Sequence, residues 1–289
     1  MYRKFGGEDE ILSQEELIDK LKKEANSIRR DLLTMISNAE KGHPGGSLSA
    51  TDIVTALYFT VMNIDPDRPE WEKRDRFILS KGHACPVWYT ALARRGYFAK
   101  EHLSTLRKNN SMLQGHPDMK KTPGIDMTAG SLGNGLSIGL GMALAAKKKN
   151  LDYKVYVMLG DGEIEEGMVW EAAMAAGNLK PSNLLAIVDY NGIQNDDQVK
   201  NIMGLEPLID KWKAFGWKVK EIEGNRMEEV IDGFTWWKKV GGPAVIIAHT
   251  VKGKGVSFME NSVEWHGGSI SEKQLEKALS ELERTEVNG

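Results

Sequence analysis

Unbroken apolar runs are the feature that most limits what this chain can fold into. The segments KVYVML at 154–159 and LLAIVD at 184–189 are almost free of alternating polar residues, and further strand candidates lie at 76–80, 217–222 and 244–249. Strands that are apolar on both sides are typical of a parallel sheet, because helical crossovers cover both of its faces. Helical patterns alternate with these runs, without a linker or an internal repeat. The sequence therefore predicts one α/β unit with a mainly parallel sheet and helices on both faces.

Apolar residues at helical spacing occupy the segments around the strand candidates. The pattern predicts helices at 13–39, 51–61, 84–95, 168–177 and 227–240. A loop rich in small residues is expected to enter a closely packed helix within 129–148. The first helix is expected to stop at the glycines of the segment KGHPGG.

Composition excludes several classes of protein. The formal net charge of −3 gives the chain no overall basic field for nucleic acid or anionic lipid. No apolar run approaches the roughly 18 to 20 residues that span a bilayer, and the charged N-terminus lacks the apolar stretch of a secretory signal. The single cysteine, Cys85, cannot form an intramolecular disulfide, which fits a reducing compartment. We therefore expect a cytoplasmic protein that binds neither nucleic acid nor membrane.

Polar side chains follow two successive strand candidates. Asp161 lies between two glycines after the first strand, and Asn191 follows the second. The carboxyl ends of parallel strands meet at one edge of a sheet, so a carboxylate oxygen and an amide oxygen can converge there. Such an oxygen set suits Mg²⁺ or Ca²⁺ rather than zinc or copper. The spacing alone leaves open a second interpretation, in which Asp161 is a turn residue and Asn191 forms an Asx-turn beside Gly192.

Seven short motifs in order connect these residues to a known family. They are GHPGGSLS at 42–49, LSKGHA at 79–84, QGHPD at 114–118, TAGSLGNGLSIGLGMA at 128–143, GDGEIEEGMVWEA at 160–172, DYNGIQ at 189–194 and HGG at 266–268. The pair GDG and Asn191 is similar to the thiamine diphosphate fingerprint, and the whole ordered set resembles the N-terminal half of transketolases. The resemblance covers nearly the whole chain and implies the thiamine diphosphate-binding fold.

Four histidines, His43, His83, His116 and His266, each lie next to a glycine. Taken singly, each also fits an ordinary hydrogen-bonded loop histidine, and separations of dozens of residues without cysteines argue against structural zinc. The resemblance implies that His83 and His266 donate hydrogen bonds to the diphosphate. It also implies that His43 and His116 face the C1 hydroxyl and carbonyl oxygens of the substrate. Imidazole suits this role because its ordinary pKa of about 6.5 allows proton exchange near neutrality.

The resemblance assigns further positions in the glycine-rich segments. The turn around Gly130, Leu132, Gly133 and Gly135 corresponds to the segment whose backbone approaches the diphosphate, and Gly162 would give a backbone contact to the same group. Close packing of small residues explains Gly139 and Gly141 equally well, so these two are not assigned to the site. The metal ligands implied by the resemblance are Asp161, the Asn191 side chain and the Ile193 backbone carbonyl.

The acidic residues after Asp161 are expected to differ in role. Glu166 corresponds to an acid at the subunit interface, in a hydrogen-bonded network that reaches the catalytic glutamate of the partner. Glu163 and Glu165 are expected to be surface acids without such a role.

The resemblance also implies that this chain needs a partner. We expect residues 1–289 to form a single diphosphate-binding domain, with the pyrimidine-binding and C-terminal domains of full-length transketolases absent from it. A C-terminal transketolase subunit would supply the missing domain, in a heterotetramer of two plus two chains around a homodimeric core. The implied reaction transfers a two-carbon ketol unit between sugar phosphates, as in the pentose phosphate pathway, with thiamine diphosphate and Mg²⁺ or Ca²⁺.

Other functions remain possible on the sequence. One is a related thiamine enzyme, such as a deoxyxylulose phosphate synthase or a dihydroxyacetone-forming homologue. Another is a non-catalytic regulatory or scaffold subunit that keeps the fold, although a scaffold has no need of Asp161, Asn191 and the four histidines. A nicotinamide dehydrogenase is disfavoured, because no G-x-G-x-x-G motif follows a first strand with an acid about 20 residues later.

Overall fold

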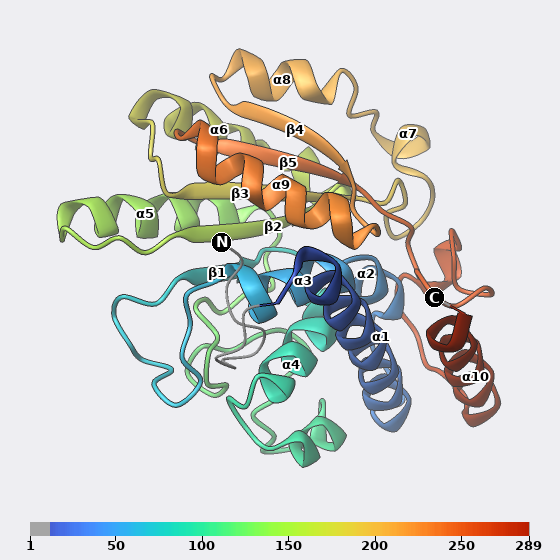
Figure 1. Cartoon of the computed structure of the whole chain (residues 1–289). Coiled ribbons are helices and arrows are strands. Elements are labelled where there is room, and N and C mark those ends of the chain that lie inside the picture. Colours follow the sequence, from blue (N-terminus) through green and yellow to red (C-terminus); the bar gives the residue numbers. More distant parts are fainter. Residues whose placement is uncertain (1–11, 289) are drawn as a thin grey trace.

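The computed structural model describes residues 12–288, and the side chains of residues 12–284. Its centre is a five-stranded sheet in the order β1-β2-β3-β5-β4, in which every neighbouring pair is parallel. The sheet confirms the predicted parallel α/β class (Figure 1). The strands are β1 (Arg76–Leu79), β2 (Val155–Gly160), β3 (Leu184–Tyr190), β4 (Lys218–Glu223) and β5 (Ala244–His249).

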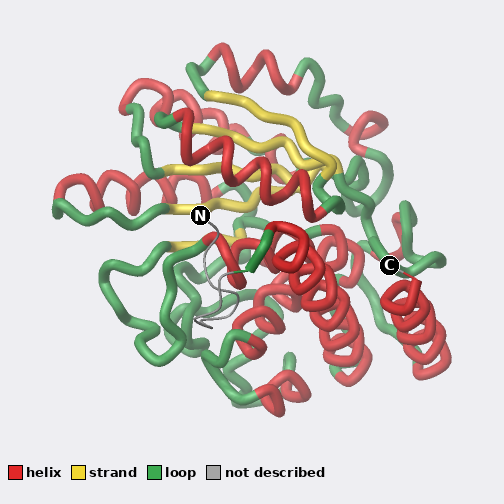
Figure 2. The backbone as a smooth tube through the Cα atoms, in the orientation of Figure 1, coloured by secondary structure: helices red, strands yellow, loops and turns green. Residues whose placement is uncertain are grey.

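Helices cover both faces of the sheet, as expected (Figure 2). One face carries α1 (Gln14–Asn38), α3 (Thr51–Ala56), α4 (Cys85–Arg94) and α9 (Met227–Val240). The other face carries α5 (Asn134–Lys148), α6 (Gly167–Leu179) and α8 (Leu208–Ala214). The remaining elements are α2 (Pro44–Ser49), a π-helical turn (Leu57–Val61), α7 (Val199–Ile202), α10 (Glu272–Asn288) and 3₁₀ turns at Gly82–Ala84, Lys100–Thr105, Gly162–Glu165 and Val263–Trp265.

Alternate residues of the inner strands enter the two cores. Tyr156 and Met158 of β2 pack among the helices of the α1 face, whereas Val155, Val157 and Leu159 pack among those of the α5 face. All of these side chains are fully buried. A strand between two cores has no solvent-facing side, and this is why its sequence lacks polar alternation.

Strand β4 is more polar in sequence than the other strands, and its exposure explains this difference. β4 lies at one end of the sheet, and most of its residues are exposed or half-buried. Polar and charged side chains are tolerated there because they reach solvent, whereas the other edge strand, β1, is mostly buried.

The structure differs from the sequence expectations in several short elements. The glycines of KGHPGG lie partly inside α2, which starts at Pro44, a favourable first residue of a helix. The helix expected at 51–61 changes to a π-helical turn at Leu57. Helix α8 was not predicted, because seven residues give too few turns for a clear period.

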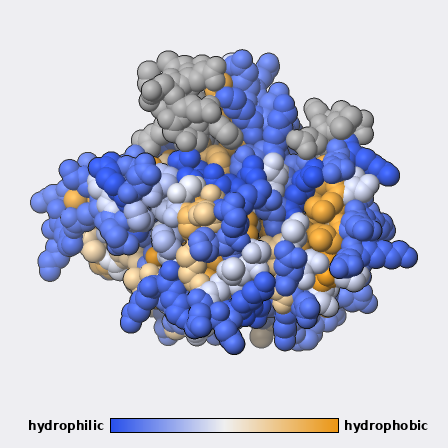
Figure 3. Space-filling model, turned by 90° about the horizontal axis from the view of Figure 1, so that it is seen from below, coloured by the Kyte–Doolittle hydropathy of each residue, from blue (hydrophilic) through white to orange (hydrophobic). Residues whose placement is uncertain are grey.

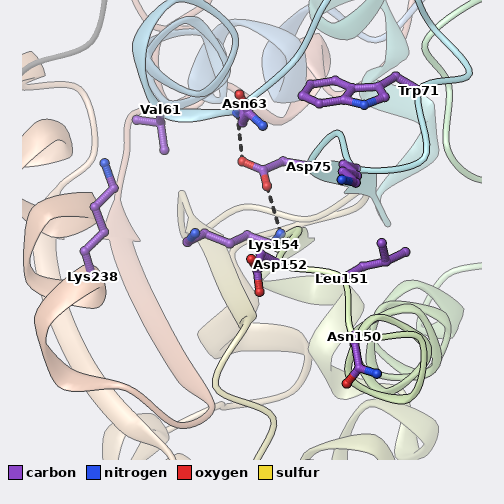
Figure 4. Close-up of a pocket in the computed structure, with 10 residues that line it drawn as sticks. Val61, Asn63, Trp71, Asp75, Asn150, Leu151, Asp152, Lys154 and Lys238 are labelled. Carbon is purple, nitrogen blue, oxygen red and sulfur yellow. Dashed lines mark hydrogen bonds between the residues drawn. The ribbon is translucent and has the colours of Figure 1, made fainter.

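A polar cavity of about 340 Å³ lies at the amino-terminal edge of the sheet (Figure 4). There the buried carboxylate of Asp75 accepts hydrogen bonds from the backbone N–H groups of Asn63 and Lys154, both at 2.8 Å. These bonds join the segments that lead into β1 and β2. The cavity is thus a full strand length away from the carboxyl edge where the predicted site lies.

Seen from below, the surface is mostly hydrophilic, with small separate hydrophobic areas (Figure 3). Among the residues that the structure describes, no helix is both long and apolar enough to cross a lipid bilayer.

Candidate functional site

A pocket of about 320 Å³ opens at the carboxyl ends of β2 and β3. It brings together all the predicted site residues except Gly133, Gly135 and Glu166. Its lining residues among those predictions are His43, His83, His116, Gly130, Leu132, Asp161, Gly162, Asn191, Ile193 and His266. Residues far apart in the sequence therefore meet at one edge of the sheet, as parallel strand topology requires.

The two strand ends are tied together by direct hydrogen bonds. In the sheet register Gly160 lies beside Asp189, so Asp161 and Asn191 follow neighbouring positions. The Asp161 carboxylate accepts from the backbone N–H of Gly162 at 2.8 Å and from that of Gly192 at 2.5 Å. The Asn191 amide oxygen accepts from the backbone N–H of Ile193 at 3.2 Å. Both side chains line the same pocket, so they do converge; an Asx-type turn is present as well.

Asp161 has the electrostatic properties expected of a metal ligand. Its residue is 3% exposed, and no basic side chain of the described chain lies within ion-pair distance of its carboxylate. Burial and the nearby charge of Asp189 raise the pKa of Asp161 to about 6. A divalent cation would supply the missing positive charge. The described residues contain no group of three or more His, Cys, Asp or Glu side chains placed to hold a metal, so a cation here would depend on amide, carbonyl and phosphate oxygens, which suit Mg²⁺ or Ca²⁺.

A buried ion pair forms the floor beneath Asn191. The fully buried Asp189 pairs with the ammonium of Lys81, and it accepts a hydrogen bond from Ser49 Oγ at 2.6 Å. Burial opposes ionisation of Asp189, but Lys81 and its hydroxyl partners hold its pKa below the ordinary value. The same carboxylate accepts from the amide nitrogen of Asn191 at 3.3 Å. This bond fixes the amide so that its oxygen, not its nitrogen, is turned away from Asp189.

Three of the four histidines form a cluster. The ring centroids of His43 and His83 are 5.0 Å apart, those of His83 and His266 are 5.2 Å apart, and those of His43 and His266 are 5.8 Å apart. Burial first, and then neighbouring positive groups, lower the pKa of His43 to about 4 and that of His266 to about 3, and hold that of His83 well below its usual range. The three rings are therefore neutral at pH 7.

His116 lies on the loop side of the pocket, against Gly130. Its ring is more exposed than the other three, and burial together with the charge of Arg107 lowers its pKa. The Nδ1 atom of His43 is buried and has no hydrogen-bond partner in the described part of the chain. An unpartnered ring nitrogen in this pocket leaves a donor or acceptor available to a ligand.

Lys252 is a pocket residue that the sequence analysis missed. Its ammonium donates to the carbonyl of Ile193 at 2.7 Å and lies 2.8 Å from Nδ1 of His266. Burial, together with the charge of Lys81, lowers the pKa of Lys252 to about 8, although Asp161 and Asp189 oppose this change. The carbonyl predicted to bind the metal therefore has a cation beside it already. A buried lysine near three neutral imidazoles is also a strong site for an anion.

The expectation that Glu163 is a surface acid is wrong. Glu163 is buried, and its carboxylate accepts from the backbone N–H groups of Gly133 at 2.9 Å and Gly160 at 3.0 Å and from the Ser80 hydroxyl. Burial raises the pKa of Glu163, although these hydrogen bonds oppose the rise. The side chain joins the glycine-rich turn to the end of β2. The surface assignment also fails for Glu165, which is half-buried and accepts from Gln194 Nε2 at 2.7 Å.

Gly133 and Glu166 lie outside the pocket lining. The Gly133 N–H is used by Glu163, and its φ of 83° is the left-handed conformation that favours glycine. Glu166 is exposed at the start of α6, beside Gly133. This exposed position is open to a second chain.

The charge of the pocket lining suits a diphosphate. A Cβ at Gly162 would lie 3.0 Å from the Gln194 side chain, and a Cβ at Gly160 would lie 3.5 Å from that of Lys81. Glycine avoids a tight contact at position 162, and the pocket lining also includes two basic side chains, Lys81 and Lys252. The residues present therefore suit an anionic cofactor tail together with a divalent cation.

The missed residues had only weak signals in the sequence. Lys81 stands inside the motif LSKGHA, and Lys252 follows the apolar strand β5 by three residues, so their strand-end positions could have indicated them. Nothing in the local sequence distinguishes Glu163 from Glu165. The two residues differ in burial because the 3₁₀ turn at Gly162–Glu165 directs Glu163 toward the end of β2.

Comparison with known proteins agrees with this site. Residues 20–284 match the family model described as transketolase, thiamine diphosphate binding domain. The chain is 46% identical to the 6-deoxy-6-sulfo-D-fructose transketolase subunit SqwG of a Clostridium species, over 93% of this chain and 98% of that protein. It is 43% identical to an apulose-4-phosphate transketolase subunit of Phocaeicola vulgatus, over 92% and 94% of the two chains.

Full-length transketolases match over part of their length. Human transketolase is 37% identical across 91% of this chain, which corresponds to 42% of the human protein. The crystal structure of transketolase from Campylobacter jejuni superposes with a TM-score of 0.87 at 32% identity, over 91% of this chain and 42% of that one. The chain thus belongs to the transketolase family, as an N-terminal subunit with its thiamine diphosphate-binding domain.

Proposed function

We propose that this chain forms, with a complementary subunit that carries a pyrimidine-binding domain, a transketolase active with thiamine diphosphate and Mg²⁺ or Ca²⁺. The complex transfers a two-carbon ketol unit from a ketose phosphate to an aldose phosphate. Residues 1–289 act as one diphosphate-binding domain, in a cytoplasmic assembly of two plus two chains. Relatives that are named as subunits, and that match this chain over nearly their whole length, support the need for a partner.

One observation carries the proposal: the buried Asp161 carboxylate, which has no ion-pair partner among the described residues, lines a pocket together with two lysines and four histidines. Asp161 supplies the negative charge for a metal, and Lys252 with the neutral rings supplies donors for an anion. A subunit that only maintained the fold would not benefit from a buried, uncompensated carboxylate, which is costly. The arrangement is better explained by a bound metal and an anionic cofactor.

Each group of this chain has a defined task in that reaction. Asp161, the Asn191 amide oxygen and the Ile193 carbonyl hold the metal, while His83, His266 and Lys252 donate to the diphosphate. When bound, thiamine diphosphate supplies the nucleophilic carbon and the electron sink for cleaving the ketose.

The remaining histidines act on the substrate. His43 and His116 are neutral at pH 7, so a ring nitrogen of each can accept a proton from a substrate hydroxyl or donate one to a carbonyl oxygen. Their low pKa values keep the acceptor form available.

An apolar face suits the complementary subunit. Ile138 of α5 and Met174 and Leu179 of α6 are large hydrophobic side chains that are exposed on adjacent helices, with Met174 58% exposed. Gly141 on α5 faces open space, which lets another chain approach the helix closely. Exposed Glu166 stands at the start of the helix that carries Met174, which supports its proposed role at this interface. Substituting Met174→Glu is expected to prevent assembly without unfolding this chain.

The relatives suggest the chemical class of the donor. The names of two of them specify a sulfonated ketose and a phosphorylated one, both with a terminal anion. We therefore extend the proposed donors to ketoses with a terminal phosphate or sulfonate.

Co-expression with the product of the adjacent reading frame tests the proposal. The purified complex should transfer ketol units from such ketoses when thiamine diphosphate and Mg²⁺ are added. Asp161→Ala should abolish both turnover and cofactor binding, whereas the exposed Asp196→Ala, a matched loss of a carboxylate on a nearby loop, should keep both. Full turnover by this chain alone would refute the need for a partner. Condensation of pyruvate with an aldose phosphate instead would favour the deoxyxylulose phosphate synthase alternative.

A further inference from the structure

Arg107 is an unpaired cation beside the catalytic pocket. It follows the 3₁₀ turn at Lys100–Thr105 and is half-buried. Among the residues that the structure describes, no carboxylate forms an ion pair with its guanidinium and no acceptor receives a hydrogen bond from it. A guanidinium keeps its charge at any ordinary pH, so its N–H donors remain available to an anion.

A short hydrogen-bonded loop brings Arg107 back to the segment before His116. The Arg107 backbone N–H donates to the carbonyl of Leu113 at 2.9 Å, which closes the loop between these residues. The returning segment is anchored to α4, because the Tyr89 hydroxyl donates to the carbonyl of Gln114 at 2.9 Å. The backbone on both sides of the guanidinium is therefore held in place.

Gly115 leaves room for the Arg107 guanidinium. A Cβ at Gly115 would lie 2.7 Å from Arg107 Cζ, 2.8 Å from Nη1 and 3.0 Å from Nη2. The guanidinium thus lies against the backbone of the residue that precedes His116, and His116 itself lines the catalytic pocket. The Arg107 side chain ends at the His116 edge of that pocket.

The charges around the substrate-facing histidines agree with this placement. Burial first, and then the charge of Arg107, lower the pKa of His43 to about 4, and the same two causes lower the pKa of His116. Lys252 and the exposed Lys41 add further positive charge around His43. This side of the pocket therefore favours an anionic group.

We propose that Arg107 binds the terminal phosphate or sulfonate of the sugar, so that this subunit contributes to the choice of donor. The inference rests on the proposed ketol transfer, in which His43 and His116 face the reacting end of the sugar. A guanidinium suits the other end, because its parallel N–H groups can donate to two oxygens of a phosphate or sulfonate at once. Arg107 is thus a specificity residue that does not touch the reacting atoms.

Steady-state kinetics of the complex with its complementary subunit test this role. The probes are D-fructose 6-phosphate and 6-deoxy-6-sulfo-D-fructose, which have a terminal anion, and L-erythrulose, a ketose without charge. Arg107→Met should raise KM for the anionic ketoses by about tenfold, because a charge-assisted contact is lost. The kcat values and the KM for L-erythrulose should not change, since the lost contact is the same before and during reaction. Arg107→Lys should restore part of the affinity.

Two more variants separate the position of the guanidinium from its charge. Gly115→Ala keeps the charge but displaces the end of the flexible Arg107 side chain, so it should also raise KM for the anionic ketoses with little cost to the fold. The matched control is Lys108→Met, which removes an exposed neighbouring charge and should behave as the wild type. Circular dichroism of each variant checks that the chain is folded.

Several outcomes would overturn the role of Arg107. They are an unchanged KM for the anionic ketoses in Arg107→Met, an equal rise in KM for L-erythrulose, or a fall in kcat with every donor. The proposed function fails separately, if the wild-type complex transfers a ketol unit from none of the three donors. Isothermal titration of the two anionic ketoses then tests Arg107 alone: about tenfold weaker binding by the Arg107→Met complex would support its role, whereas equal affinity, or no binding by the wild type, would contradict it.

Discussion

Replacing the buried carboxylate at 161 should remove a loss of folding stability that the metal-free chain undergoes as the pH rises from about 4 to about 6. The pKa of Asp161 in the folded chain is about 6, compared with an ordinary value of 3.8. The folded state therefore binds more protons than the unfolded state between these two values, so this group makes stability fall as pH rises through that window. At 1.36 kcal/mol per pH unit, the difference amounts to about 3 kcal/mol.

The comparison of wild type with Asp161→Asn isolates this contribution. His43 and His266 act in the opposite direction, because their lowered pKa values make stability rise with pH below their ordinary value. Their effect is common to both proteins and cancels in the difference. With a chelator present, urea unfolding from pH 4 to pH 7 should show the variant gaining about 2 kcal/mol relative to the wild type, because part of the effect lies below pH 4.

Adding the metal completes the test. Mg²⁺ with thiamine diphosphate should stabilise the wild type above pH 6, where Asp161 is ionised, and should give Asp161→Asn no comparable stabilisation. The reasoning is refuted if the difference between the two proteins does not change with pH, or if the cofactor and metal stabilise both equally. Asp196→Ala serves as the control, because its exposed carboxylate should change neither result.

The same contacts lead to three further predictions. Lys252 loses its proton near pH 8, so calorimetry should show thiamine diphosphate affinity falling as pH rises above 8, and Lys252→Met should bind weakly at every pH. In urea unfolding, Glu163→Ala should cost about 2 to 6 kcal/mol because it leaves two buried backbone N–H groups unpaired, whereas Glu165→Ala should cost about 1 kcal/mol. Thermal melting should show that Gly177→Ala lowers the stability by several kcal/mol, because its Cβ would overlap a backbone carbonyl before β4, while Gly141→Ala, which meets open space in a helix, should raise it by about 1 kcal/mol.

The sheet shows how far local sequence reasoning reaches. The apolar runs predicted β2 and β3 to within one residue, because a strand between two helical layers must be apolar on both sides. Short elements such as α2 and α8 were missed, because six or seven residues contain too few turns to show a period.

The sequence by itself determined that Asp161 and Asn191 reach the same edge of a parallel sheet, since both follow strands of one direction. It also carried the family motifs, whose histidines line one pocket. Only the tertiary structure decided that Glu163 points inward and that Lys81 and Lys252 meet beneath that pocket. Charge and hydrogen bonding at those positions depend on neighbours from β1, β5 and the glycine-rich turn, which lie dozens of residues away, and no local pattern records such distant partners.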